Sequence, residues 1–195
     1  RMRAELLYQQ ADLVGALRAV NHAIAREPAG EPAKVDRCRF IGGFGALQEA
    51  EDCLKEVARE HSVSDRQRTQ QLRLRNVRGD FSTSLSLLDA FAQPDPWARP
   101  AYLALNGQAA EALAIYRTLA PELFKQPLGS TPIAFPAQYI DVAIAMQMTG
   151  GKDQAEKLLR HGLRMTASHP FSGTVGRYWS DVTAYTLLGD LPKAC

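Results

Sequence analysis

The feature that most constrains this chain is an internal repeat with a period close to 34 residues. The pattern is a glycine, a small residue five positions later, and mostly apolar residues four and seven positions beyond that. Gly45, Ala50, Leu54 and Val57 form one such copy. The small residues are 34, 34, 28, 43 and 39 positions apart, and they are Ala16, Ala50, Ser84, Ala112, Ala155 and Ala194. A repeat of this length predicts a stack of similar units, none of which can bury its apolar face alone.

The packing of two antiparallel helices explains the spacing within each copy. The glycine permits the tight turn between the helices. The small residue lets the second helix lie close to the first, and the apolar positions after it share one helical face. In the first copy Ala11 replaces the glycine, so the pattern gives its weakest support to that turn.

This alignment of the copies predicts helices along the whole chain. The predicted pairs are 4–10 with 12–26, 31–42 with 46–60, 65–78 with 81–92, 97–106 with 108–124, and 137–149 with 152–166, followed by a single helix over 175–188. The segment 126–136 predicts a loop, because its prolines and glycine break a helix.

Two successive spacings of 34 with these anchors resemble the tetratricopeptide repeat, and Gly79-Asp80-Phe81 is similar to that family's Gly-x-aromatic turn. The resemblance implies an all-α, right-handed α-α superhelix, a tetratricopeptide-like solenoid of about five and a half helix pairs with a concave face. We expect one domain over 1–195, a fragment of a longer chain, with units at about 1–28, 31–62, 65–92, 97–124, 137–167 and a truncated 175–195.

Composition and motifs argue against catalysis and against a metal or cofactor site. The net charge is only +2, which does not demand nucleic-acid binding, and no apolar run approaches the roughly 20 residues of a membrane helix. Cys38, Cys53 and Cys195 have no metal-site spacing, and their odd number predicts no disulfide framework. The four histidines are scattered, and no serine or cysteine has the context of a nucleophile. We therefore predict no enzyme activity, no cofactor and no metal.

The strongest candidate for binding is a run of arginines in the helix predicted at 65–78. This helix has five arginines and no acid between Arg66 and Arg78. Family register places the first helix of each unit along the concave groove, with Asp141 in the fifth unit. Arginine forks suit carboxylates, so we predict an acidic ligand at Arg39, Arg66, Gln70, Arg73 and Asn76. The alternative is a solvated face whose arginines pair with acids on neighbouring helices.

The resemblance also allows one known binding mode to be tested. Chaperone-binding members hold a terminal carboxylate with a lysine and two asparagines of the first two units. The matching residues here are Arg1, Glu5 and Asp36, and the two acids would repel a carboxylate. The clamp is therefore absent.

Aromatic residues give a second set of candidates. Trp97 and Trp179 fall on groove positions and could anchor a ligand, whereas Tyr139 and Tyr178 fall where the family places a packing residue. The rival explanation for the tryptophans is local packing around the short helix predicted at 97–106.

These observations predict a non-catalytic module that binds a protein or peptide, with a structural module that self-associates or packs on other domains of its own chain as the alternative. The segments 105–113, 119–124 and 185–190 look like the repeat-bearing sensor halves of bacterial transcription regulators. That resemblance implies a sensor or adaptor role, with no direct contact between this domain and nucleic acid. We expect a cytoplasmic location, with the periplasm as the alternative.

Overall fold

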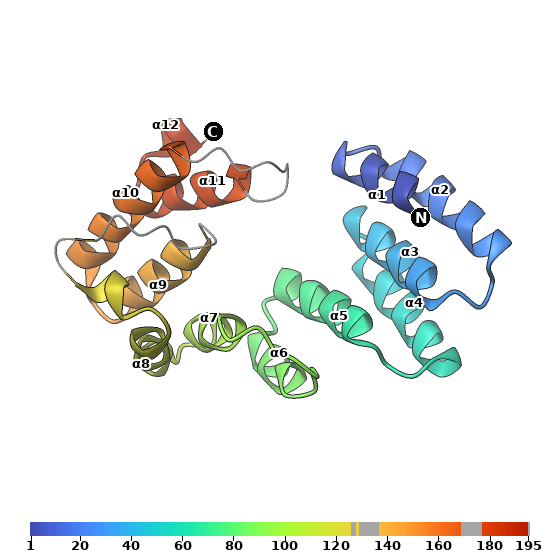
Figure 1. The fold of residues 1–195 in the computed structure, drawn as a ribbon, viewed down its shortest axis with the longest axis horizontal. Coiled ribbons are helices and arrows are strands. Elements are labelled where there is room, and N and C mark those ends of the chain that lie inside the picture. Colours follow the sequence, from blue (N-terminus) through green and yellow to red (C-terminus); the bar gives the residue numbers. More distant parts are fainter. Residues whose placement is uncertain (126–127, 129–136, 169–176, 195) are drawn as a thin grey trace. The chain divides into compact units, whose positions relative to one another are not determined.

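The computed structural model describes residues 1–125, 128, 137–168 and 177–194, and all regular structure within these ranges is helical (Figure 1). The chain divides into two compact units, Arg1–Gln93 and Pro94–Cys195. Among the described residues, no helix has both the length and the apolar character needed to cross a bilayer.

Unit 1 is a series of helices that pack mainly on their neighbours in the sequence. The α3 helix packs on α2, α4 and α5, and α5 also packs on α4 and α6. The helices are α1 (Met2–Gln9), α2 (Leu13–Arg26), α3 (Glu31–Gly43), α4 (Leu47–Glu60), α5 (Asp65–Arg78) and α6 (Phe81–Leu88).

Unit 2 is built in the same way around α9, which contacts α7, α8, α10 and α11. Its elements are α7 (Ala98–Leu105), α8 (Ala109–Leu119), a 3-10 turn η1 (Pro121–Phe124), α9 (Ala137–Met148), α10 (Lys152–Ser168), α11 (Arg177–Leu187) and α12 (Leu191–Ala194). The predicted loop over 126–136 lies, apart from residue 128, outside the described residues.

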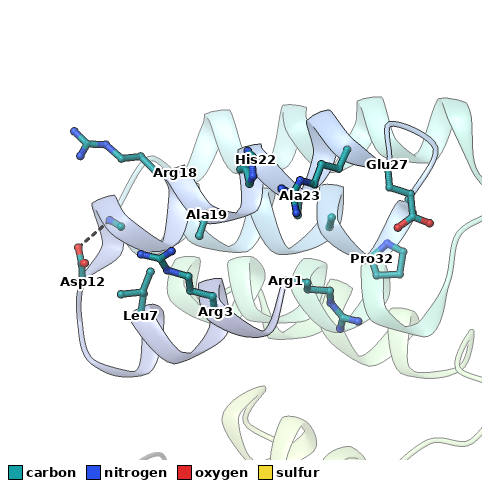
Figure 2. A pocket seen from close by; sticks show the side chains of 14 residues that line it. Arg1, Arg3, Leu7, Asp12, Arg18, Ala19, His22, Ala23, Glu27 and Pro32 are labelled. Atoms are coloured by element: carbon teal, nitrogen blue, oxygen red, sulfur yellow. Dashed lines mark hydrogen bonds between the residues drawn. The ribbon is translucent and has the colours of Figure 1, made fainter.

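The turns within the helix pairs follow the repeat pattern. Gly79, at the end of α5, has a φ of 72°, which a residue without a Cβ adopts at little cost. The next residue, Asp80, caps α6 by accepting a hydrogen bond from the backbone of Thr83. In the first turn Ala11 adopts a φ of 60° without being glycine, and Asp12 then caps α2 through the backbone of Gly15 (Figure 2). The antiparallel pair forms there as well, at the cost of a strained alanine.

Two predicted helices end earlier than expected. The α6 helix ends at Leu88 rather than at 92, with Asp89 as its C-cap. The α8 helix ends at Leu119, because Pro121 lacks the backbone N–H that a continuing helix would need. The chain then forms the separate turn η1, which begins at Pro121.

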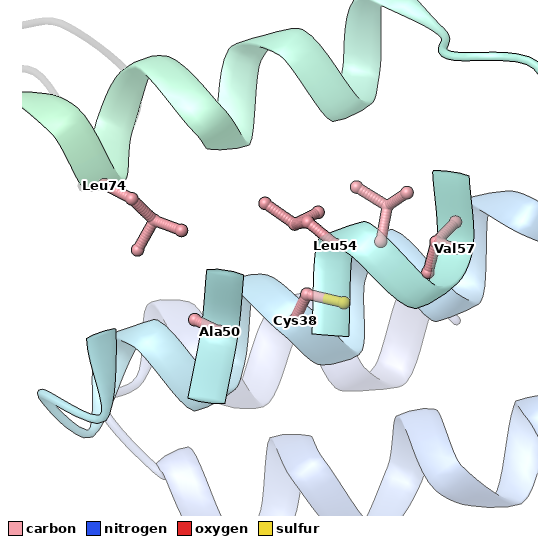
Figure 3. Close-up of a cluster of buried hydrophobic side chains, with 6 residues drawn as sticks. Cys38, Ala50, Leu54, Val57 and Leu74 are labelled. Atoms are coloured by element: carbon pink, nitrogen blue, oxygen red, sulfur yellow. The ribbon is translucent and has the colours of Figure 1, made fainter. Parts of the chain in front are cut away.

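The core of the second helix pair shows why its anchor is small. Ala50 is fully buried where α4 crosses α3, in a cluster with the side chains of Val35, Cys38, Leu54, Val57 and Leu74 (Figure 3). A Cβ built on Gly42 of α3 would lie 3.5 Å from the Cβ of Ala50, so the helices are in close contact there.

The prediction of no disulfide framework is wrong at one pair. Cys38 on α3 and Cys53 on α4 form a disulfide, with their Cα atoms 5.5 Å apart and 15 positions between them in the sequence. The reasoning from cysteine number and short motifs missed it because the pairing depends on contact across a helix pair. The helix alignment itself carried that signal, since it placed Cys38 opposite the second helix of its unit.

Candidate functional site

A network of ion pairs joins α1, α3 and α5 in unit 1. Asp36 of α3 is 3% exposed and accepts a hydrogen bond from Nε of Arg1 at 3.0 Å. The same carboxylate pairs with the Arg66 guanidinium of α5. Arg39 of α3 pairs with Glu5 of α1. These contacts place the predicted residues Arg39 and Arg66 within one cluster, which we call the α1–α3–α5 face.

The α1–α3–α5 face is completed by a row of residues on α5. Arg66, Gln70 and Arg73 follow at spacings of four and three, so they share one side of the helix. Arg73 is exposed, and its Nη1 donates to Oε1 of Gln70 at the long distance of 3.4 Å. Asn76 lies one further turn along α5 and is exposed.

The charges on this face do not cancel. The carboxylates of Glu5 and Asp36 stand against the guanidinium groups of Arg1, Arg39, Arg66 and Arg73. The arginine without an acidic partner in this set is Arg73. The face therefore has a positive excess, and the exposed guanidinium of Arg73 suits a ligand carboxylate.

Arg39 has a structural role besides its charge. Its guanidinium carbon lies 4.7 Å from the ring centre of Tyr8 and 4.9 Å from that of Phe40, and its side chain is largely buried. Contacts of this kind between a cation and an aromatic ring are attractive. Packing and the Glu5 pair thus fix Arg39, and less of its charge is available to a ligand.

Other arginines of α5 follow the alternative prediction of a solvated, paired face. Arg75 contacts Asp80 at 2.6 Å, and Arg78 contacts Glu51 of α4 at 2.8 Å. Hydrogen bonds from Thr83 and then from Arg75 hold the pKa of Asp80 below its usual value. These arginines complete helix contacts and are not part of the candidate site.

The structure explains why two of the three clamp positions are acidic. Asp36 is buried between two arginines, and Glu5 neutralises Arg39, so both acids complete internal pairs. A terminal carboxylate at this point would compete with Asp36 for the same guanidinium groups.

In unit 2 the candidate aromatic residue is Trp97, which precedes α7. Its backbone N–H donates to Asp95 at 3.0 Å, and its ring centre lies 5.6 Å from that of Tyr116 on α8. Tyr116 is fully buried, whereas Trp97 is partly exposed, so the indole covers Tyr116 and keeps one surface open. The other candidate, Trp179, lies in α11, and its side chain is outside the described residues.

The sequence did not reveal that the carboxyl of Asp141 on α9 has a raised pKa. Burial raises the pKa of its carboxyl to about 6, and the negative charge of Asp95 adds to the rise. Burial also raises the pKa of the Tyr116 phenol, with a further contribution from Asp141. The repeat alignment placed Asp141 towards the groove, but only the packing of α9 shows that the carboxylate is poorly solvated.

No group of three histidine, cysteine or acidic side chains that could hold a metal ion occurs in the part of the chain that the structure describes.

Comparisons with known proteins identify the fold. No protein-family model matches the sequence, and no curated protein matches it. A tetratricopeptide repeat protein from Parabacteroides merdae aligns over 99% of this chain and 73% of its own, with 16% identity and a TM-score of 0.56. MamA aligns over 85% of this chain and 95% of its own, with 14% identity and a TM-score of 0.55.

A third solved structure is YrrB, described as a tetratricopeptide repeat protein with an unusual peptide-binding site. It aligns over 85% of this chain and 84% of its own, with 14% identity and a TM-score of 0.53. The prediction of an all-α, tetratricopeptide-like solenoid is confirmed, and the chain has the fold of the tetratricopeptide repeat proteins.

Proposed function

We propose that this chain is a non-catalytic module that binds an acidic protein segment on the α1–α3–α5 face of unit 1. The observation that carries the proposal is the positive excess on that face, centred on Arg73 beside Arg66. The fold supports it in general terms, since one similar structure is described as having a peptide-binding site.

The proposed ligand contacts differ in strength among the predicted residues. Arg73 offers its fork directly to a ligand carboxylate, and Asn76 lies exposed one turn further along α5. Gln70 is buried beside Arg73 and accepts a hydrogen bond from it, so we propose that it positions the guanidinium group. Arg66 is held by Asp36 at one guanidinium nitrogen and retains donors for a second carboxylate. Arg39 shapes the face from beneath. In unit 2 we propose that Trp97 and Trp179 supply apolar anchors for the same kind of ligand.

We further propose that this repeat domain, spanning both units, serves as a sensor or adaptor in a larger bacterial regulatory protein and does not itself contact nucleic acid. The similarity of segments 105–113, 119–124 and 185–190 to the sensor halves of transcription regulators supports this role.

A self-associating module is the second candidate, because large apolar side chains are exposed at one end of unit 1. Met2 is 85% exposed, Leu6 59% and Val14 52%. Exposed apolar groups of this kind favour contact with another protein surface, including a second copy of this chain.

For the compartment we propose the periplasmic alternative over the cytoplasmic prediction. The Cys38–Cys53 pair supports it, because disulfides persist in oxidising compartments and are rare in the reducing cytosol.

The test is the affinity of a fluorescein-labelled, flexible peptide of Glu, Gly and Ser residues, measured by fluorescence anisotropy. We expect Arg73→Glu to weaken binding about tenfold, since it removes one charged contact and adds a repulsion. Arg66→Gln is the second variant, because a glutamate at 66 would face the buried Asp36 and threaten folding.

The matched control is Arg37→Glu, at an exposed arginine of α3 outside the face. Equal affinities for the wild type, Arg73→Glu and Arg37→Glu would refute the proposed site. Far-UV circular dichroism checks that each variant remains helical.

A further inference from the structure

Unit 1 has a second basic surface, which shares Arg1 with the α1–α3–α5 face and is otherwise built from different residues. A groove of about 760 Å³ runs along α2 beside α1 and the start of α3 (Figure 2). We call it the α1–α2 groove. Its residues on α2 include Gly15, Ala19, His22 and Arg26, whose spacings of three and four place them on one side of the helix.

The floor of the α1–α2 groove is apolar, and most of its side chains are small. Leu7 of α1, Ala19 and Ala23 of α2, and Ala33 of α3 form it. Leu7, Ala19 and Ala23 are partly buried and pack on the core cluster of this helix pair. Small floor residues let the backbone of an occupant come close to α2.

The rim of the α1–α2 groove is basic, and three of its arginines are not neutralised by acids of the described chain. Arg3, Arg18 and Arg26 line the groove and are exposed, and none forms an ion pair or side-chain hydrogen bond within the part of the chain that the structure describes. His22 lies between Arg18 and Arg26 on α2. Most arginines of α5, in contrast, pair with acids of unit 1.

Two acids stand at the groove, and they do not neutralise the arginine side chains. Asp12 caps α2 through its hydrogen bond with the backbone of Gly15 at 2.8 Å. Glu27 follows the last residue of α2, beyond Arg26. The middle of the groove is therefore positive, and its charge complement is an occupant with carboxylates along both edges.

We propose that the α1–α2 groove docks an acidic amphipathic helix of a partner protein. From Gly15 to Arg26 the groove follows twelve residues of α2, or about 16 Å at the rise of an α-helix, which matches about three turns of an occupant. Apolar residues of the partner helix lie on the alanine floor, and its glutamates or aspartates reach Arg3, Arg18 and Arg26. The long axis of the groove and its small floor residues favour a helix over an extended chain.

The probe for this proposal is a hydrocarbon-stapled helical peptide with alanine and leucine on one face and glutamates flanking it. We expect saturable binding to the full chain, weakened about tenfold or more by Arg18→Glu combined with Arg26→Glu, because two attractions become repulsions. Both arginines are exposed, so the fold should survive the change.

The matched control is Arg37→Glu combined with Arg59→Glu, which changes the net charge equally at exposed positions outside the groove. This control should bind the probe like the wild type, and a stapled peptide with lysines in place of glutamates should not bind. Equal losses in the two double variants, or no saturable binding, would overturn the proposal.

The stapled and flexible probes distinguish the α1–α2 groove from the α1–α3–α5 face. If Arg73→Glu weakens the stapled probe and the Arg18→Glu, Arg26→Glu variant does not, the helix binds the other face and the α1–α2 groove is refuted. If the groove variant alone loses the stapled probe while the flexible probe is unaffected by Arg73→Glu, the groove stands and the proposed function fails.

Discussion

Replacing Asp141 with asparagine should stabilise unit 2 at neutral pH. The carboxyl of Asp141 has a pKa of about 6 in the folded chain, above the 3.8 of an ordinary aspartate, mainly because of burial and then because of Asp95. The folded state therefore disfavours the charged form. Asparagine has nearly the same shape and no charge, so it removes this penalty.

The magnitude follows from the two pKa values. A rise from 3.8 to about 6 corresponds to about 3 kcal/mol of lost stability at pH 7, where the carboxylate is charged in both states. Because the side chain is half-buried, solvent screening reduces the gain expected from Asp141→Asn to about 2 kcal/mol.

The stabilising effect of Asp141→Asn should depend on pH. Below 3.8 the carboxyl is neutral in both the folded and unfolded chain, so no penalty remains. The stabilising effect of Asp141→Asn should thus be largest at pH 7 and fall below about 1 kcal/mol near pH 4. Wild-type unit 2 gains from protonation of this group as the pH falls through 6.

Urea unfolding followed by tryptophan fluorescence measures the effect in unit 2 alone, because both tryptophans of the chain, Trp97 and Trp179, belong to that unit. Asp153→Asn is the control, since Asp153 is exposed in the first turn of α10 and its loss should be slightly destabilising. A destabilised Asp141→Asn variant, or a gain that does not change between pH 7 and pH 4, would show that burial does not penalise the charged Asp141 carboxylate.

Two further predictions concern unit 1. Cys53→Ser should lower its free energy of unfolding by about 3 kcal/mol, because the Cys38–Cys53 bond closes a loop with a separation of 15 residues. Urea unfolding followed by circular dichroism, with Cys195→Ser as the control, measures it, and an unchanged midpoint would show that the bond does not form. Ala50→Trp should cost about 3 kcal/mol or more, because Ala50 is fully buried at the crossing of α3 and α4. The same substitution at the exposed Ala25 should be nearly neutral, and a wild-type melting temperature for Ala50→Trp would contradict the helix alignment.

The helices could be predicted because each pair repeats one local pattern. A turn glycine, a small anchor and apolar residues on one face are short-range signals, and the observed turns at Gly45, Gly79, Gly107, Gly150 and Gly189 all have positive φ. The ends of α6 and α8 were harder to predict, because the repeat pattern does not mark where the second helix of a pair stops.

The candidate site was only partly predictable. Spacing alone put Arg66, Gln70 and Arg73 on one side of a helix, and the structure places them so. The acids that neutralise the arginines belong to other helices, and Asp36 is 35 positions from Arg1 and 30 from Arg66, so the sequence could not pair them. The Cys38–Cys53 bond, the burial of Asp141 and the α1–α2 groove likewise depend on contacts between helices.

Binding of an acidic segment to the α1–α3–α5 face is tested most directly by a nuclear magnetic resonance titration of the full 21.4 kDa chain with the flexible acidic peptide. Side-chain Nε–Hε signals of arginine report which guanidinium groups receive a ligand carboxylate. We expect saturable shifts of the Arg73 and Arg66 signals and unchanged Arg37 and Arg59 signals. Saturable binding that shifts neither Arg66 nor Arg73 would contradict it.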